Sequence, residues 1–249
     1  MMLNSDGAQQ AVRGKVGTGV RGAISKFYPN YVSENDLFLA TVARYLREDF
    51  IVLDAGCGSG GFRYSWKQKV EFLVGCDLTE ELPRNSNIDA GVFADLAHLP
   101  FASGTFDVIF SHYVMEHVDA PGDVFSEFAR ILKPGGKLII LTPSKYHYVS
   151  LLGRSLPHWF HERIGELRGN AAHDVFPTRY VANSRADLTR HGKASGLALI
   201  EFIATEARPN YLMWSLPSFL LGVAYERVVN RFDMLSPLRS SIIAVFEQP

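Results

Sequence analysis

Short apolar segments that alternate with helix-like segments constrain the fold of this chain most strongly. Five of them lie between positions 50 and 143, at residues 50–55, 70–77, 90–95, 106–111 and 136–143. Nearly continuous apolar runs of this length are typical of parallel strands that are covered on both faces. Residues 120–132 place apolar side chains at helical spacing before a Lys-Pro-Gly-Gly stop. The alternation predicts a doubly wound α/β sheet.

Ligands of such sheets lie beyond the carboxyl ends of the strands, so the residues at strand ends are the most informative. The first expected strand runs into VLDAGCGSGG, residues 52–61, which fits the pattern G-x-G-x-x-G through Gly56, Gly58 and Gly61. Three glycines permit a tight turn and let the backbone approach a ligand closely. Proteins that bind NAD and proteins that bind S-adenosylmethionine both need such a loop. The glycines alone therefore leave the cofactor open.

Two aspartates near this loop bear on the choice between NAD and S-adenosylmethionine. Asp54 precedes the first glycine by two residues. A carboxylate there can stabilise a cationic methionine group, whereas it would repel a pyrophosphate, so Asp54 favours S-adenosylmethionine in part. Asp77 ends the second expected strand, where an acidic residue can accept hydrogen bonds from ribose hydroxyls with either cofactor. The alternative for Asp77 is a solvated loop residue.

The combined motifs resemble those of the class I S-adenosylmethionine-dependent methyltransferases, in particular the type named methyltransferase domain 11. The resemblance covers residues 50–143 and rests on VLDAGCGSG, GCDL, ADLAHLPF, FDVIFSHYVMEHV and LKPGGKLIILTP. It implies a seven-stranded, mostly parallel sheet of the Rossmann-like methyltransferase fold, with N-terminal helices and with lid insertions after strands five and six. It also implies S-adenosylmethionine as the cofactor and S-adenosylhomocysteine as the product.

The resemblance assigns donor contacts to residues near the ends of the first four strands: Asp54, Gly56, Gly58, Asp77, Leu78, Asp95, Leu96 and Ser111. It implies that the glycine backbone holds the methionine ends, that Asp77 binds the ribose and that Leu78 lies against the adenine. It further implies that Asp95 and the Leu96 amide bind the adenine edge. Ser111 would line the methionine arm through its backbone.

An aromatic segment, which includes Tyr28, precedes the helix expected within residues 34–48. The resemblance implies that this N-terminal segment closes over the donor. A tyrosine beside a sulfonium can make a cation–π contact, so Tyr28 is assigned to the donor site. Core packing is the alternative for its ring.

A general base assists transfer to a hydroxyl group, and the histidines are the candidates for it. His112 directly follows the fourth expected strand, and its alternatives are packing or contact with water. His173 and Asp174 are a second candidate, as a base and its orienting carboxylate, with a loop-stabilising pair as the alternative.

No metal site is predicted. The segment with Glu116 and His117 resembles that of ubiquinone-biosynthesis O-methyltransferases, in which an acidic cluster is associated with a divalent metal. This chain has Tyr113 where that group has a further Glu.

A single methyltransferase domain is expected over residues 1–249. Its expected parts are an N-terminal tail with cap helices (1–48), a cofactor-binding core (49–143), two acceptor lid insertions (144–183 and 205–237), and the last helix and strands (184–204 and 238–249). Ser184 with Asp187 three residues later predicts the start of that last helix. The final strands are expected at residues 196–204 and 240–247, and the resemblance makes them antiparallel at one sheet edge.

Composition limits the partners. The chain is 47% hydrophobic and has a net charge of −1, so it can bury a large core and has no strongly basic face for nucleic acid. Two cysteines fit a reducing cytoplasm, which is the expected location. The longest apolar run, residues 211–225, is too short to span a membrane and contains Pro217. Three roles for this apolar run stay open: lining an acceptor pocket, forming a dimer face, or contacting a membrane surface. The expected oligomeric state is a monomer or a homodimer.

The sequence therefore predicts a cytoplasmic enzyme that transfers a methyl group from S-adenosylmethionine to a small, partly apolar metabolite, preferably at oxygen. Nitrogen, sulfur and carbon acceptors stay open. A protein that binds S-adenosylmethionine without transferring the methyl group is the alternative class.

Overall fold

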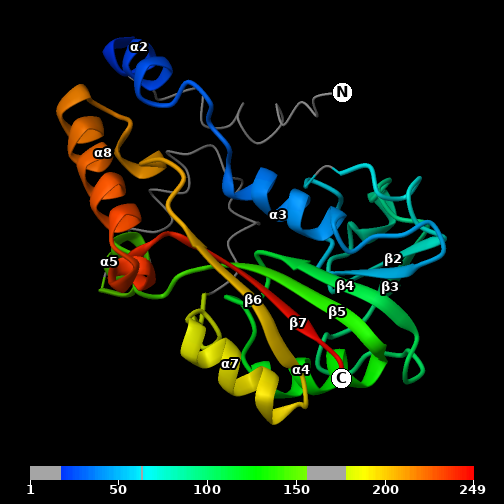
Figure 1. Cartoon of the computed structure of the whole chain (residues 1–249). Coiled ribbons are helices and arrows are strands. Elements are labelled where there is room, and N and C mark those ends of the chain that lie inside the picture. Colours follow the sequence, from blue (N-terminus) through cyan, green and yellow to red (C-terminus); the bar gives the residue numbers. More distant parts are fainter. Residues whose placement is uncertain (1–17, 63, 156–177) are drawn as a thin grey trace. The chain divides into compact units, whose positions relative to one another are not determined.

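The computed structural model describes residues 18–62, 64–155 and 178–249 (Figure 1). The chain divides into two compact units. Unit 1 consists of Met1–Leu37, Ser144–Pro177 and Ala204–Ser241, and unit 2 of Phe38–Pro143, Thr178–Ile203 and Ile242–Pro249. The candidate pair His173 and Asp174 lies outside the described residues.

The sheet has seven strands in the order β3-β2-β1-β4-β5-β7-β6. Their bounds are β1 Ile51–Ala55, β2 Phe72–Asp77, β3 Ala90–Phe93, β4 Phe106–His112, β5 Leu132–Pro143, β6 Ala198–Thr205 and β7 Ser241–Glu247. All seven expected strands are present. Each begins or ends within a few residues of the expected position, as is usual for element boundaries.

Most of the sheet is parallel. β1 pairs in parallel with β2 and β4, and the pairs β2–β3 and β4–β5 are also parallel. At the beginning of β5, the Gly135 amide donates to the Gln248 carbonyl (2.7 Å) and the Gln248 amide donates to the Gly136 carbonyl (3.0 Å). Gln248 follows the end of β7, so β7 runs antiparallel to β5. This confirms the predicted mostly parallel sheet of the Rossmann-like methyltransferase fold.

The helices are α2 Thr18–Phe27, α3 Glu34–Ala43, α4 Pro121–Ile131, α5 Tyr148–Ser155, α7 Arg185–Ala194 and α8 Leu216–Arg231, with short 3₁₀ turns η2 Leu82–Arg84, η4 Asn210–Leu212 and η5 Asp233–Leu238. The Ser184 side chain accepts a hydrogen bond from the Asp187 amide, so the predicted start of the last helix is correct. The Lys-Pro-Gly-Gly segment ends α4 as expected. It lies within the first part of β5, where the pairing with β4 shifts between Phe106 and Val108.

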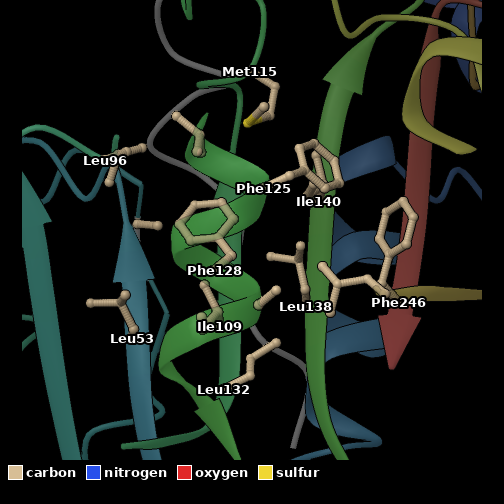
Figure 2. Close-up of a cluster of buried hydrophobic side chains, with 14 of the residues drawn as sticks. Leu53, Leu96, Ile109, Met115, Phe125, Phe128, Leu132, Leu138, Ile140 and Phe246 are labelled. Carbon is tan, nitrogen blue, oxygen red and sulfur yellow. The ribbon is translucent and has the colours of Figure 1, made fainter. Parts of the chain in front are cut away.

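The largest apolar core of unit 2 lies between α4, α7 and one face of the sheet (Figure 2). Leu53 and Ile109 from the central strands pack there with Phe125 and Phe128 from α4 and with Phe246 from β7. Successive residues of a strand point to opposite faces, so Asp54 and Phe110 belong to the other face.

That other face carries an aromatic cluster. Phe62, Tyr64 and Trp66 follow the glycine loop at alternate positions, and the Tyr64 and Trp66 rings lie 5.4 Å and 4.8 Å from the Phe110 ring. A spacing of two fits extended chain and not helix. Accordingly, the described residues between β1 and β2 contain no helix.

In unit 1, α2 packs against α8. Val20 from α2 is buried with Met213, Phe219 and Val223. Pro217 lies in the first turn of α8, after a Ser215 cap, where proline is tolerated because no amide donor is needed there. Among the described residues, no helix has the length and apolar character required to cross a membrane.

Candidate active site

The strand register brings the predicted donor residues to one edge of unit 2. Asp54 on β1 pairs with Gly75 on β2 and with Phe110 on β4. Asp77 on β2 pairs with Phe93 on β3. The carboxyl ends of β1, β2, β3 and β4 therefore lie side by side, and the residues that follow them share that edge.

The glycine loop adopts a backbone that other residues rarely adopt. Gly56, Gly58 and Gly60 have φ angles of 83°, 53° and 86°. A Cβ atom at Gly56 would collide with the side chain of Val114, which follows β4. Glycine is therefore required at Gly56 both for its conformation and for the close approach of the β4 segment. Gly60, which the sequence pattern did not single out, shares the left-handed conformation.

Two asparagines that sequence reasoning missed hold this loop in place. The Asn85 side-chain amide donates to the carbonyls of Cys57 (3.1 Å) and Gly58 (3.3 Å). The Asn87 side chain donates to the carbonyls of Gly60 (3.3 Å) and Phe62 (2.9 Å). Both precede β3, in an Asn-Ser-Asn stretch that resembles an ordinary polar turn, so the sequence carries no signal of these long-range partners.

Asp77 is tied to the same loop. One of its carboxylate oxygens accepts a hydrogen bond from the Gly58 amide (2.8 Å), and the other accepts one from the Thr79 amide (2.9 Å). A carboxylate has about four lone-pair sites, so both oxygens retain the capacity to accept further hydrogen bonds. The carboxylate is thus oriented at the end of β2 with acceptor capacity left.

Asp54 is only 4% exposed, and its carboxylate accepts a hydrogen bond from the Tyr64 hydroxyl. Burial raises the pKa of Asp54 to about 7, with a further rise from the nearby Asp77, although the bond from Tyr64 opposes it. A buried carboxylate that resists ionisation is stabilised by a nearby cation. The edge therefore offers a site for a ligand with a positively charged group.

The remaining predicted donor residues surround this edge. Leu78 directly follows Asp77 and is 58% exposed, so its apolar surface is free to cover a flat ring. The Asp95 carboxylate accepts from the Ala97 amide (2.9 Å), while Leu96 is buried. Ser111 is fully buried, and its hydroxyl has no hydrogen-bond partner among the residues that the structure describes.

His112 ends β4 inside an aromatic group. Its ring stacks on Phe62, with centroids 3.6 Å apart and planes inclined by 7°, and it lies 5.5 Å from Phe38. Burial lowers the pKa of His112 to about 3. The imidazolium form is thus costly here, which disfavours the uptake of a proton by this ring at neutral pH.

Tyr28 belongs to unit 1. Its hydroxyl donates to a Glu226 carboxylate oxygen (3.1 Å), and its ring lies edge-on to Phe219 with centroids 6.2 Å apart. The described contacts of Tyr28 are therefore contacts within unit 1, and its assignment to the donor site stays a prediction. Within the described ranges, no three His, Cys, Asp or Glu side chains gather in a way that could hold a metal ion.

Comparison with known proteins matches the part of the chain that contains this edge to a known domain family. Residues 53–140 match the family described as methyltransferase domain. The malonyl-acyl-carrier-protein O-methyltransferase of Enterobacter lignolyticus is 33% identical over 132 residues, which are 49% of this chain and 53% of that protein. The chain spans about half or less of the length of the first curated relatives it matches.

Solved structures of the same fold cover more of the chain. A candidate methyltransferase from Haloferax volcanii, solved with a methyltransferase activator, aligns with 97% of this chain and 95% of its own at a TM-score of 0.59 and 19% identity. Geranyl diphosphate methyltransferase, solved with S-adenosylmethionine, aligns with 87% of this chain and 84% of its own at a TM-score of 0.56 and 16% identity. At these identities the alignments show the fold alone. Residues 53–140, within unit 2, thus match a methyltransferase domain, and the solved structures show that the chain has the fold of these methyltransferases.

Proposed function

We propose that this protein transfers a methyl group from S-adenosylmethionine to a small, partly apolar metabolite, with oxygen as the acceptor atom. The observation that carries this proposal is the pair Asp54 and Asp77 on either side of the glycine loop. One carboxylate is buried and favours a cationic ligand, and the other is oriented at a strand end with acceptor capacity left.

These residues fit S-adenosylmethionine. Bound there, it would supply a methyl group on a cationic sulfur, which is already activated for displacement. Gly58 has no side chain and has open space beside its Cα, so the backbone of the loop can approach a ligand closely there. Asp77 is assigned to the ribose hydroxyls, Asp95 and the Leu96 amide to the adenine edge, and the exposed Leu78 to the adenine face.

The protein's contribution to the reaction is mainly alignment. Well-oriented reactants can account for about 7–11 kcal/mol of a barrier. In this proposal the glycine loop and Asp77 fix the donor, Asp54 balances its charge, and His112 with Phe62 forms an apolar wall. Tyr28, His173 and Asp174 stay assigned to the closing segment and the acceptor side as predictions.

The acceptor is proposed from weaker support. The curated relatives are named for methylation at oxygen, which supports an oxygen acceptor here. The match to these two relatives covers 49% and 36% of this chain, so their named acceptor is not assigned to it. Residues 144–183 and 205–237 are proposed as the acceptor lid, and the cytoplasmic location and the monomer or homodimer state are also proposals.

A transfer assay with methyl-labelled S-adenosylmethionine tests the proposal. The intact chain is incubated with a panel of small phenols, alcohols, amines, thiols and carboxylic acids, and labelled product is measured. Transfer to a hydroxyl compound, weakened together with donor binding in an Asp77→Ala variant, is the expected result. If the donor binds but no member of any acceptor class is labelled, the protein belongs to the alternative class that binds S-adenosylmethionine without transfer.

A further inference from the structure

The exposed side of α8 in unit 1 is apolar, whereas the exposed side of a surface helix is usually polar. Successive helical residues are about 100° apart, so positions 217, 220, 221, 224 and 228 fall on one side of the helix. All of them are apolar and exposed. With the exposed positions beside them they form the α8 face, which consists of Leu216, Pro217, Leu220, Leu221, Ala224, Arg227, Val228 and Arg231. This face carries apolar and cationic side chains and no acidic one.

The opposite side of α8 fixes the orientation of the helix. Phe219 is fully buried there, in a cluster that includes side chains of α2. A Cβ atom at Gly222 would collide with the Pro209 side chain, so the helix backbone lies as close to Pro209 as it can. Glu226, which is also on this buried side, accepts a hydrogen bond from the Tyr28 hydroxyl (3.1 Å). Rotation of α8 about its axis would break these contacts, so the fold itself directs the apolar α8 face outward.

Large apolar side chains also stand at both ends of α8. Trp214, which precedes the helix, is 67% exposed, and Met234, which follows it, is 84% exposed. On the α8 face itself, Leu221 is 68% exposed. Single apolar residues scattered over a surface are ordinary, but a group of them on one element is typical of a surface that binds a partner or a membrane.

The exposed charges of α8 and of the helix beside it are positive. Arg227 and Arg231 lie on the α8 face. α2, which packs against α8 (Figure 1), adds the exposed Arg21 and Lys26 and contains no acidic residue. The acidic residue of α8, Glu226, is buried, and Arg227 pairs with it at 3.4 Å. The two helices thus present cations and no exposed carboxylate, which suits an anionic surface.

The same charges argue against a second copy of this chain as the occupant. Two copies that bury the α8 face against each other would bring their arginines together, and like charges across an interface are costly. Asp233, the first acidic residue after α8, already pairs with Arg239 of its own chain at 3.4 Å. A protein partner would need a groove for this convex face, whereas lipid headgroups can move aside around exposed side chains. Tryptophan and arginine beside an apolar helix face are typical of helices that lie in a membrane interface.

We propose that unit 1 docks on the surface of an anionic lipid bilayer through the α8 face. Trp214, Leu220 and Leu221 enter the boundary between headgroups and acyl chains, while Lys26 and Arg231 bind headgroup phosphates. α8 has 16 residues and is therefore about 24 Å long, so it lies in the plane of the membrane without crossing it. This inference goes beyond the proposed function and does not depend on methyl transfer.

Co-sedimentation of the intact chain with vesicles tests the proposal. One set of vesicles is phosphatidylcholine alone, and the other has equal parts of phosphatidylcholine and phosphatidylglycerol. Wild type should bind the phosphatidylglycerol vesicles about tenfold or more tightly, and this preference should weaken as sodium chloride is added. The Trp214 fluorescence, taken as the difference between wild type and Trp214→Phe, should be quenched by lipids with brominated acyl chains. Quenching of this kind reports entry into the bilayer and not mere adsorption.

Variants separate the apolar contribution from the electrostatic one. Leu220→Gln combined with Leu221→Gln removes apolar surface and should weaken binding to the phosphatidylglycerol vesicles about tenfold or more. Arg231→Gln and Lys26→Gln should each weaken it about fivefold, because each removes one cation from an anionic surface.

Matched controls come from exposed positions of unit 2. Ile200→Gln on β6 removes an exposed apolar side chain, and Lys193→Gln on α7 removes an exposed cation. Both should bind the vesicles as wild type does. All of these variants should melt at the wild-type temperature, because substitutions at exposed positions rarely change stability.

Three outcomes would overturn the proposal. The first is no binding to the phosphatidylglycerol vesicles, or equal binding to both kinds of vesicle. The second is vesicle binding that the α8 variants and the unit 2 controls weaken equally. The third is a wild-type dimer in sedimentation equilibrium that Leu220→Gln with Leu221→Gln dissociates, because it would assign the α8 face to a second copy. Vesicle binding is measured without donor or acceptor, so its result is independent of the methyl-transfer assay.

Discussion

At the residue scale, Asp54 links donor binding to pH. Burial and the neighbouring Asp77 raise its pKa to about 7, whereas a cationic donor favours its charged form. Donor affinity in wild type should therefore fall as pH drops below about 7, by up to about tenfold per pH unit. Asp54→Asn should bind the donor more weakly at pH 8 and lose this dependence. Titration calorimetry between pH 5.5 and pH 8 measures both effects, with exposed Asp49→Asn as the control. An unchanged slope in Asp54→Asn would assign the linkage to another group.

Asp77 tests the ribose contact. Hydrogen bonds to a charged acceptor are worth roughly 1.5–3 kcal/mol, so Asp77→Ala should weaken donor binding by about 10–150-fold. Part of this loss comes from the Gly58 amide, which the carboxylate also holds. Asp89→Ala is a matched control, because that carboxylate likewise accepts from a backbone amide, that of Leu73 (2.9 Å). Donor affinity that is unchanged in a folded Asp77→Ala protein, or equally reduced in both variants, would contradict the assignment.

The sequence predicted which residues stand at the strand ends near the expected donor, but it did not predict which side chains contact them. Asp54, Gly56 and Asp77 stand in local motifs at strand ends, where short-range pattern and fold coincide. The partners Tyr64 and Asn85 come from other parts of the chain, and no local spacing reveals such contacts. The low pKa of His112 could not be predicted from the sequence either, because it results from burial against the Phe62 and Phe38 rings, which only the fold brings near it.

At the scale of elements, the strands were predictable because buried parallel strands are continuous apolar runs, and the start of α7 was predictable from Ser184. The structure of the loop after β1 was less predictable from the sequence. Its structure depends on side-chain hydrogen bonds from Asn85 and Asn87 and on aromatic residues that pack on the sheet at alternate positions.

Mutation of Asn85 tests whether the two asparagines hold the glycine loop in the conformation that binds the donor. Asn85→Ala removes three hydrogen bonds of a side chain that is almost fully buried. The carbonyls of Cys57 and Gly58 lose their donor, and the Asn87 amide loses its acceptor. An unsatisfied buried group costs about 1–3 kcal/mol, so donor affinity should fall roughly 5–150-fold if the loop must be held for binding. Thermal unfolding is measured in parallel. A variant with a lower melting temperature but normal donor affinity at 10 °C would show that Asn85 stabilises the fold without shaping the site.

At the scale of the whole molecule, each unit holds a buried carboxyl group with a raised pKa outside the donor edge. Burial raises the pKa of Glu206 in unit 1 and of Glu116 in unit 2 to about 7. Each group thus contributes stability below its unfolded pKa, and this contribution is lost as pH rises through about 7. Glu206→Gln, like Glu116→Gln, should therefore raise the melting temperature more at pH 8 than at pH 5. Calorimetric scans at both pH values check this, and an equal change at the two would contradict the raised pKa of Glu206.

Titration calorimetry tests most directly whether the edge of unit 2 binds S-adenosylmethionine, with separate injections of S-adenosylmethionine, S-adenosylhomocysteine and NAD. Wild type should bind the first two with dissociation constants in the micromolar range, which corresponds to about −8 kcal/mol, and should show no heat with NAD. Asp54→Asn should lose more affinity for S-adenosylmethionine than for S-adenosylhomocysteine, because both carry an ammonium group but only the former also carries a sulfonium charge. Binding of NAD in preference to both, or the absence of binding by either sulfur compound, would contradict the account.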